Sequence, residues 1–121
     1  MTTKSFGDQG EEVAAQYLEK HGCRILERQF RTKVGEIDII AEEDGVLLFV
    51  EVKTRRPTCF GAPAQAVGYA KQQRIFRTAF LYLQKRGLEE RACRFDIIEV
   101  LVTGGSQTVR RYENAFEFGG F

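Results

Sequence analysis

The segment Val46–Lys53 restricts the fold of this chain more than any other feature. Residues 46–50 are all apolar, so this strand would bury both of its faces. A strand of this kind belongs in the middle of a sheet that is covered on both sides. Its end carries Glu51 and Lys53, whose side chains share one face because side chains alternate along a strand. The sequence therefore predicts a covered sheet with a charged pair at the end of a central strand.

Two segments carry apolar residues at helical spacing. Residues 5–21 form the first predicted helix, with a start of the capping-box kind at Asp8 and Glu11 and an end at Gly22. Residues 63–86 form the second, ended by Gly87, and its inner row consists of Val67, Lys71, Ile75, Ala79 and Leu83. Because a lysine in such a row must snorkel or meet an acid, we expect Lys71 to contact acidic side chains on the sheet.

Further strands are indicated by short apolar runs between polar or glycine-containing turns. They cover residues 23–30, 37–41, 94–102 and, as a last edge strand, 108–113. Residues 42–45 predict a hairpin turn, residues 55–61 a loop, and residues 104–106 another turn. The order helix, three strands, helix and one or two strands predicts an α/β fold. Its central mixed sheet is flanked by helices, and it is not a doubly wound array.

Length and composition narrow the class of protein. A chain of 121 residues is expected to form one domain over residues 1–121. Its net charge is +1, so any binding of nucleic acid must come from local clusters of cations. Three widely spaced cysteines and one histidine argue against a zinc site or a disulfide framework. With no signal-peptide pattern in residues 1–10 and no long apolar run, we expect a cytoplasmic protein without membrane association.

Asp38 and Glu51 lie on consecutive predicted strands joined by a short turn, so the strands are expected to pair. Two carboxylates brought together repel each other unless one is protonated or both share a cation. Oxygen ligands without histidine or cysteine favour Mg²⁺ or Mn²⁺. Lys53 reaches the same face, where it can orient a water molecule or offset phosphate charge. This chemistry suits metal-assisted hydrolysis of a phosphodiester.

Cations surround these residues in the sequence: Arg28, Arg31, Lys33, Arg55, Arg56, Arg74 and Arg77. Basic clusters near an acidic pocket fit contacts to a phosphate backbone, although a solvated basic face would have the same composition. No motif for reading bases is present. We therefore expect that any nucleic acid is recognised by its backbone or shape.

The segments Gly35–Asp38 and Phe49–Arg55 resemble the core of PD-(D/E)xK nucleases, with Ile37 in place of the proline of that name. Over nearly the whole chain, the sequence resembles the YraN-type family of uncharacterised bacterial proteins, which is similar to archaeal Holliday-junction resolvases. The further residues that carry this resemblance are Gly10-Glu11-Glu12, Ala15, Val67, Lys71, Ala79 and Arg94-Phe95-Asp96. The resemblance implies a restriction-endonuclease-like core.

The resemblance also implies roles for individual residues. Asp38, Glu51 and the carbonyl of Val52 would bind Mg²⁺ or Mn²⁺, with Glu12 close to the ion, and Lys53 would be the catalytic lysine. The resemblance also places Lys71 at a polar position that faces the site. From the residues themselves, Arg55, Arg56 and Arg74 are expected to contact nucleic acid, and Glu36 is expected to share the face of Asp38. A resolvase acts on branched DNA and needs two active sites, which favours a homodimer.

Other interpretations stay open. Asp38 would also fit a strand end, Glu51 with Lys53 an ion pair at a sheet edge, Glu36 a solvated charge, and Glu12 an acid favoured by the helix dipole. Asp96 is expected to be a structural hydrogen-bond acceptor. The aromatic residues Phe116, Phe118 and Phe121 would either dock on the sheet or form an exposed patch. The whole chain would then be an endonuclease, a nucleic-acid-binding module with an idle site, or a structural adaptor.

Overall fold

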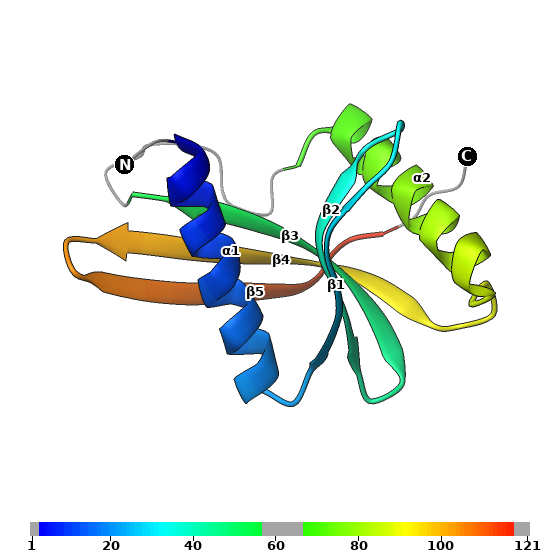
Figure 1. The fold of residues 1–121 in the computed structure, drawn as a ribbon, viewed down its shortest axis with the longest axis horizontal. Coiled ribbons are helices and arrows are strands. Elements are labelled where there is room, and N and C mark those ends of the chain that lie inside the picture. Colours follow the sequence, from blue (N-terminus) through cyan, green and yellow to red (C-terminus); the bar gives the residue numbers. More distant parts are fainter. Residues whose placement is uncertain (1–2, 57–66, 118–121) are drawn as a thin grey trace.

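Five strands and two helices form the computed structural model, which describes residues 3–56 and 67–117 (Figure 1). In chain order they are α1 (Thr3–Lys20), β1 (Arg24–Arg31), β2 (Glu36–Glu43), β3 (Val46–Arg55), α2 (Tyr69–Arg86), β4 (Cys93–Thr103) and β5 (Ser106–Phe116). This is the predicted order, with two strands after the second helix. The predicted α/β fold is confirmed.

The sheet contains its strands in chain order from β1 to β5. Strands β3 and β4 are parallel, and every other neighbouring pair is antiparallel, so the sheet is mixed as predicted. A parallel pair requires a crossover, and α2 lies within this crossover. Strands β2 and β3 are joined by a tight turn at Asp44 and Gly45, with φ angles of +51° and +81°. This conformation favours aspartate followed by glycine in hairpins.

The two helices bury opposite faces of the sheet. On one face, α1 contributes Ala14, Ala15 and Leu18 to a core that also contains Leu48 and Val50. The other core lies between the sheet and α2, where Leu47 and Phe49 belong to one cluster with Ile75, Phe76 and Ala79. Strand β3 therefore fills both cores, as its unbroken apolar run predicted.

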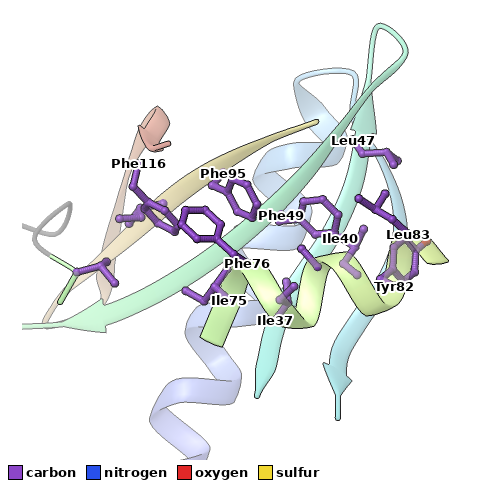
Figure 2. Packing of buried hydrophobic residues seen from close by; sticks show 13 residues of the cluster. Ile37, Ile40, Leu47, Phe49, Ile75, Phe76, Tyr82, Leu83, Phe95 and Phe116 are labelled. Carbon is purple, nitrogen blue, oxygen red and sulfur yellow. The ribbon is translucent and has the colours of Figure 1, made fainter. Parts of the chain in front are cut away.

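Aromatic rings dominate the core beneath α2 (Figure 2). Phe76 of α2 packs edge-on against Phe95 of β4, with ring centroids 4.7 Å apart. Phe116 stacks on Phe95 at 5.5 Å and is buried, so it docks on the sheet. Strand β5 reaches Phe116 and is longer than the predicted segment 108–113 because this aromatic contact continues the pairing with β4. Phe118 and Phe121 lie outside the described residues.

Several predicted boundaries are wrong. Helix α1 begins at Thr3, so Asp8 and Glu11 lie inside the helix and do not form a capping box at its start. Helix α2 begins at Tyr69, because Gly68 adopts an extended conformation with φ −63° and ψ 154°. Residues 63–66 and 57–61 are outside the described part of the chain. At the other end of α2, Gly87 has the left-handed conformation expected of a C-cap, with φ +66°.

Asp96 lies at the centre of a cluster of charged side chains on the sheet, as expected of a structural hydrogen-bond acceptor. Its side chain is fully buried, and it accepts hydrogen bonds from Arg94, Arg111 and the backbone N–H of Asn114. The bond to Asn114 stabilises an irregular part of β5, where Asn114 has a φ of +53°. Both arginines also pair with Glu43 of β2. The cluster therefore ties β2, β4 and β5 together.

Candidate active site

Strand pairing brings Asp38 and Glu51 together. Ile39 of β2 pairs with Val50 of β3, and one further step of this register sets Asp38 opposite Glu51. One oxygen of Asp38, Oδ2, accepts a 2.8 Å hydrogen bond from the backbone N–H of Val52. The second carboxylate oxygen is not used by this bond. The two carboxylates thus face the same end of the sheet, where the hairpin prediction placed them.

Strand β2 is irregular at Asp38. Ile37 belongs to the core beneath α2 and Ile39 to the core beneath α1, although alternate residues of a regular strand share one face. The partner position on β1 is Gln29, which lies between the pairs Arg28–Ile39 and Phe30–Ile37. Gln29 has a φ of +52°, a conformation that costs a residue with a side chain free energy and that is enriched at functional sites. The distortion opens Asp38 to both faces of the sheet.

Two pockets meet at Asp38. One of about 200 Å³ lies beneath α2 and is lined by Gly35, Glu36, Asp38, Glu51, Lys71, Arg74 and Ile75. The other, of about 330 Å³, lies beside α1, and its lining includes Phe6, Glu11, Gln29, Arg31, Glu36 and Asp38. A third pocket of similar size near Cys93 is mainly apolar and contains none of these carboxylates. The ionisable side chains that line these pockets are therefore gathered around Asp38.

Asp38 carries an unfavourable negative charge. Burial, followed by the charge of Glu51 and smaller contributions from Glu11 and Glu36, raises the pKa of its carboxyl group to about 7. The hydrogen bond from Val52 acts in the opposite direction. A carboxylate held beside other carboxylates is stabilised either by a proton or by a cation. The site therefore favours a bound positive charge at neutral pH.

Lys71 supplies one such charge. Its Nζ lies 2.6 Å from Glu51 Oε1, so the acidic contact predicted for this lysine is present. Helix α2 approaches β2 closely here because Gly35 has no side chain: a Cβ at Gly35 would lie 2.9 Å from Thr78 Oγ1. Thr78 is fully buried and donates to the carbonyl of Arg74. The glycine thus lets α2 bring Lys71 and Arg74 over the carboxylates.

Lys53 lies two residues beyond Glu51, on the same face of β3 by alternation, and is half-buried. In the register it pairs with Glu99 of β4. It is not among the described residues that line the two pockets at Asp38. The structure therefore places Lys71 on Glu51, whereas Lys53 lies two residues further along β3.

Three of the predicted cations, Arg28, Arg31 and Arg55, form ion pairs within the chain. Arg55 Nε is 3.1 Å from Glu99 Oε2, and Glu99 is almost fully buried, so Arg55 balances an internal charge. Arg56 lies over the ring of Phe6, with 4.7 Å to its centroid. Arg31 pairs with Glu36 at 2.9 Å. Arg74 lines the pocket beneath α2 and is the cation best placed beside Lys71.

Glu11, not Glu12, is the acidic residue of α1 on the side of the site. Glu12 is exposed and pairs with Arg28 at 2.7 Å, and it does not line either pocket at Asp38. Glu11 is buried, lines the pocket beside α1 and raises the pKa of Asp38. The structure therefore brings Glu11, and not Glu12, to the pockets at Asp38. Helical spacing could have identified Glu11 in the sequence, because Glu11 shares the buried face of α1 with Ala14, Ala15 and Leu18.

Residues 10–100 match a family described as "Uncharacterised protein family UPF0102". This range includes the carboxylates, both lysines and most of the sheet. The chain belongs to the UPF0102 family. The resemblance to YraN-type proteins found in the sequence is thereby confirmed.

UPF0102 relatives match almost the whole chain. The protein from Alkaliphilus metalliredigens is 46% identical over 114 residues, which cover 94% of this chain and 99% of the relative. The protein from Symbiobacterium thermophilum is 47% identical over 115 residues, 94% of this chain and 98% of the relative. Among solved structures, SfsA from Pyrococcus furiosus in complex with Ca²⁺ matches with a TM-score of 0.36 and 16% identity. That match covers 96% of this chain and 65% of SfsA, and a likeness this low carries no argument.

A membrane span is not found in the described part of this UPF0102 chain, where neither helix is long and apolar enough to cross a bilayer. Nor do three His, Cys, Asp or Glu side chains of the described residues form a ready-made metal centre. Two carboxylates do share one end of the sheet, and the N–H of Val52 points toward β2. The Val52 carbonyl is expected to point to the same side, since the two groups of a strand residue face one partner. This donor set fits Mg²⁺, which keeps several waters.

Proposed function

We propose that this UPF0102 protein is a metal-dependent endonuclease that hydrolyses phosphodiester bonds of DNA. The observation that carries the proposal is the pairing of Asp38 with Glu51 on neighbouring strands, which raises the pKa of Asp38. This charge arrangement calls for a cation, and its oxygen donors suit Mg²⁺ or Mn²⁺. The apolar pocket near Cys93 offers no comparable set of charged groups.

Each residue of the site has a proposed task. Asp38, Glu51 and the Val52 carbonyl would hold the ion, and the buried Glu11 would add negative charge from α1. A bound Mg²⁺ or Mn²⁺ supplies Lewis-acid activation of water and phosphate. Lys53, on the face of Glu51, would orient the attacking water. Lys71 and Arg74, at the pocket beneath α2, would bind the phosphate charge.

The DNA substrate is proposed to be branched or otherwise structured, and the enzyme to act as a cytoplasmic homodimer. The choice of substrate and of a homodimer rests on the resemblance to Holliday-junction resolvases, and the cytoplasmic location rests on the composition of the sequence. The described residues favour recognition of the DNA backbone over reading of its bases. The cations near the site line pockets together with acidic side chains, and none of them lies on a recognition helix.

Cleavage of labelled DNA tests the proposal. The substrates are linear, flapped, nicked and four-way DNA, each incubated with Mg²⁺ or Mn²⁺. We expect cleavage of at least one branched substrate by the wild type, and its loss in Glu51→Gln and Lys53→Ala with the fold retained by circular dichroism. Metal-independent DNA binding without cleavage of any substrate would instead support the nucleic-acid-binding module. If the protein neither cuts nor binds DNA, the structural adaptor is the better description.

A further inference from the structure

Lys71 occupies the position of a counter-ion to Glu51. Its ammonium group reaches from the first turn of α2 to the sheet and lies 2.6 Å from Glu51 Oε1. The side chain of Glu51 is only 11% exposed, whereas that of Lys71 is 46% exposed. A half-exposed lysine thus contacts a carboxylate that is largely buried. One oxygen expected to bind the metal is engaged by this ion pair.

A divalent ion and the Lys71 ammonium group compete for the negative charge of the Glu51 carboxylate. A metal ion on Glu51 and the ammonium group of Lys71 would both be positively charged and would repel each other. Partial burial of the site strengthens this repulsion. Lysine has a flexible stem of four methylene groups, and its ammonium group forms no fixed two-pronged contact, so it moves at low cost. Arg74 lies one turn further along α2 and lines the same pocket. Because the Lys71 side chain is about half exposed, its ammonium group can leave Glu51 toward solvent.

We propose that Lys71 is an exchangeable counter-ion, which neutralises Glu51 in the metal-free protein and moves to a nucleic-acid phosphate when a divalent metal binds. This inference rests on the proposed function, because it assumes a metal site at Asp38 and Glu51. The exchange of Lys71 would couple the binding of the divalent metal to the binding of phosphate. Metal binding releases the lysine for phosphate, and phosphate binding in turn favours the metal.

Manganese titration followed by electron paramagnetic resonance tests the first half of the inference, without nucleic acid and without activity. We expect Mn²⁺ to bind Lys71→Met and Lys71→Gln about tenfold more tightly than the wild type, because the competing charge is gone. Lys71→Arg keeps the charge and should bind like the wild type. Lys85→Met, in the last turn of the same helix, is the matched control and should also be unchanged.

The possible results separate the two proposals. Equal or weaker Mn²⁺ binding by both neutral variants, with binding by the wild type, overturns the counter-ion exchange and leaves the metal site standing. Binding by the neutral variants alone supports the exchange. Absence of Mn²⁺ binding in the wild type and all variants overturns the metal site as well.

Inorganic phosphate serves as the probe for the second half, with binding followed by ³¹P nuclear magnetic resonance at increasing Mg²⁺ concentrations. Mg²⁺ attracts phosphate by itself, so the quantity to compare is the gain in phosphate affinity that Mg²⁺ causes. We expect this gain to be several-fold larger in the wild type than in Lys71→Met. An equal gain in both proteins would overturn the proposed transfer of Lys71 to phosphate.

Discussion

The backbone N–H of Val52 donates to Asp38 Oδ2 at 2.8 Å, so a side-chain carboxylate takes the place of a strand carbonyl between β2 and β3. This bond connects the two strands at the end of their regular register. It also holds the Asp38 carboxylate beside Glu51, where its charge is costly. Asp38 therefore links the strand pairing to the chemistry of the site.

Asp38→Asn should stabilise the folded protein at alkaline pH. The ordinary pKa of the group is 3.8, and burial beside Glu51 raises it to about 7 in the folded protein. The folded state binds this proton more tightly than the unfolded state does. The contribution of the protonated Asp38 to the free energy of unfolding is therefore complete below pH 4 and is lost as the pH rises through 7. Asparagine stays neutral and still accepts from Val52. We expect a gain on the order of 2 kcal/mol at pH 8, measured by urea denaturation.

The same comparison at pH 4 is the control for Asp38→Asn. There the wild-type carboxyl group is protonated in the folded state, and the two proteins should differ little in free energy of unfolding. A variant that is destabilised equally at both pH values would show that the Asp38 charge is not costly in the fold.

Glu11→Gln and Glu12→Gln should separate the two neighbouring acids of α1. Glu11 is buried on the site side, whereas Glu12 is exposed and paired with Arg28. We expect metal-dependent cleavage to fall by about tenfold or more in Glu11→Gln, as is usual when a group supporting a metal site is removed. Glu12→Gln should stay within about twofold of the wild type. The reverse pattern would restore the role first expected for Glu12.

Gly10→Ala should loosen the packing of α1 on β3. A Cβ at Gly10 would lie 1.7 Å from Thr54 Oγ1 and 2.8 Å from Thr54 Cβ, so the helix or the strand must shift. We expect a loss of about 1–3 kcal/mol in stability. Gly7→Ala, in the same helix, meets nothing within 4 Å and should be neutral or stabilising by about 0.5–1 kcal/mol. Equal effects of both substitutions on the unfolding midpoint would refute the close approach.

Arg111→Met should be strongly destabilising because it removes a partner from the fully buried Asp96. Arg111 Nη2 lies 3.2 Å from Asp96 Oδ2 and 3.0 Å from Glu43 Oε1. We expect a loss of about 3 kcal/mol at pH 7. Arg110→Met is the control on the same strand, where the arginine is exposed and 3.9 Å from its acidic partner. Its loss should stay within about 1 kcal/mol.

The Arg111 variant should also respond differently to acid. Hydrogen bonds from Arg111, and to a smaller extent from Arg94 and Cys23, lower the pKa of Glu43 from its ordinary value of 4.5 to about 2. The corresponding stabilisation is present above pH 4.5 and is lost as the pH falls toward 2. Without Arg111 the pKa lies closer to normal, so the stability of the variant should fall less between pH 4.5 and 2. An unchanged acid dependence would contradict this origin of the Glu43 pKa.

The parts of the fold that depend on local pattern were predictable. The apolar run of β3 indicated a central strand, and the tight turn at Asp44 and Gly45 set the register that places Asp38 opposite Glu51. The start of α2 was not predictable, because Val67 extends the apolar row although Gly68 is extended. The spacing of apolar residues indicates which face of a helix is buried, but it does not indicate at which residue the helix begins.

Contacts between distant segments decided what the sequence left open. Arg55 looks like a phosphate ligand beside the motif, but Glu99 of β4 pairs with it. The left-handed conformation of Gln29 follows from its position opposite the irregular part of β2, and no local residue pattern requires it. Lys71 was the exception, because a lysine in an apolar helical row implied its own acidic partner.

Anomalous diffraction from a crystal of this protein soaked in Mn²⁺ is the most direct test of the central claim, that Asp38 and Glu51 form one metal site. We expect a single strong anomalous peak within ligand distance of both carboxylates and of the Val52 carbonyl, with Lys71 displaced from Glu51. An occupied site elsewhere, or no peak while Lys71 remains paired with Glu51, would contradict it.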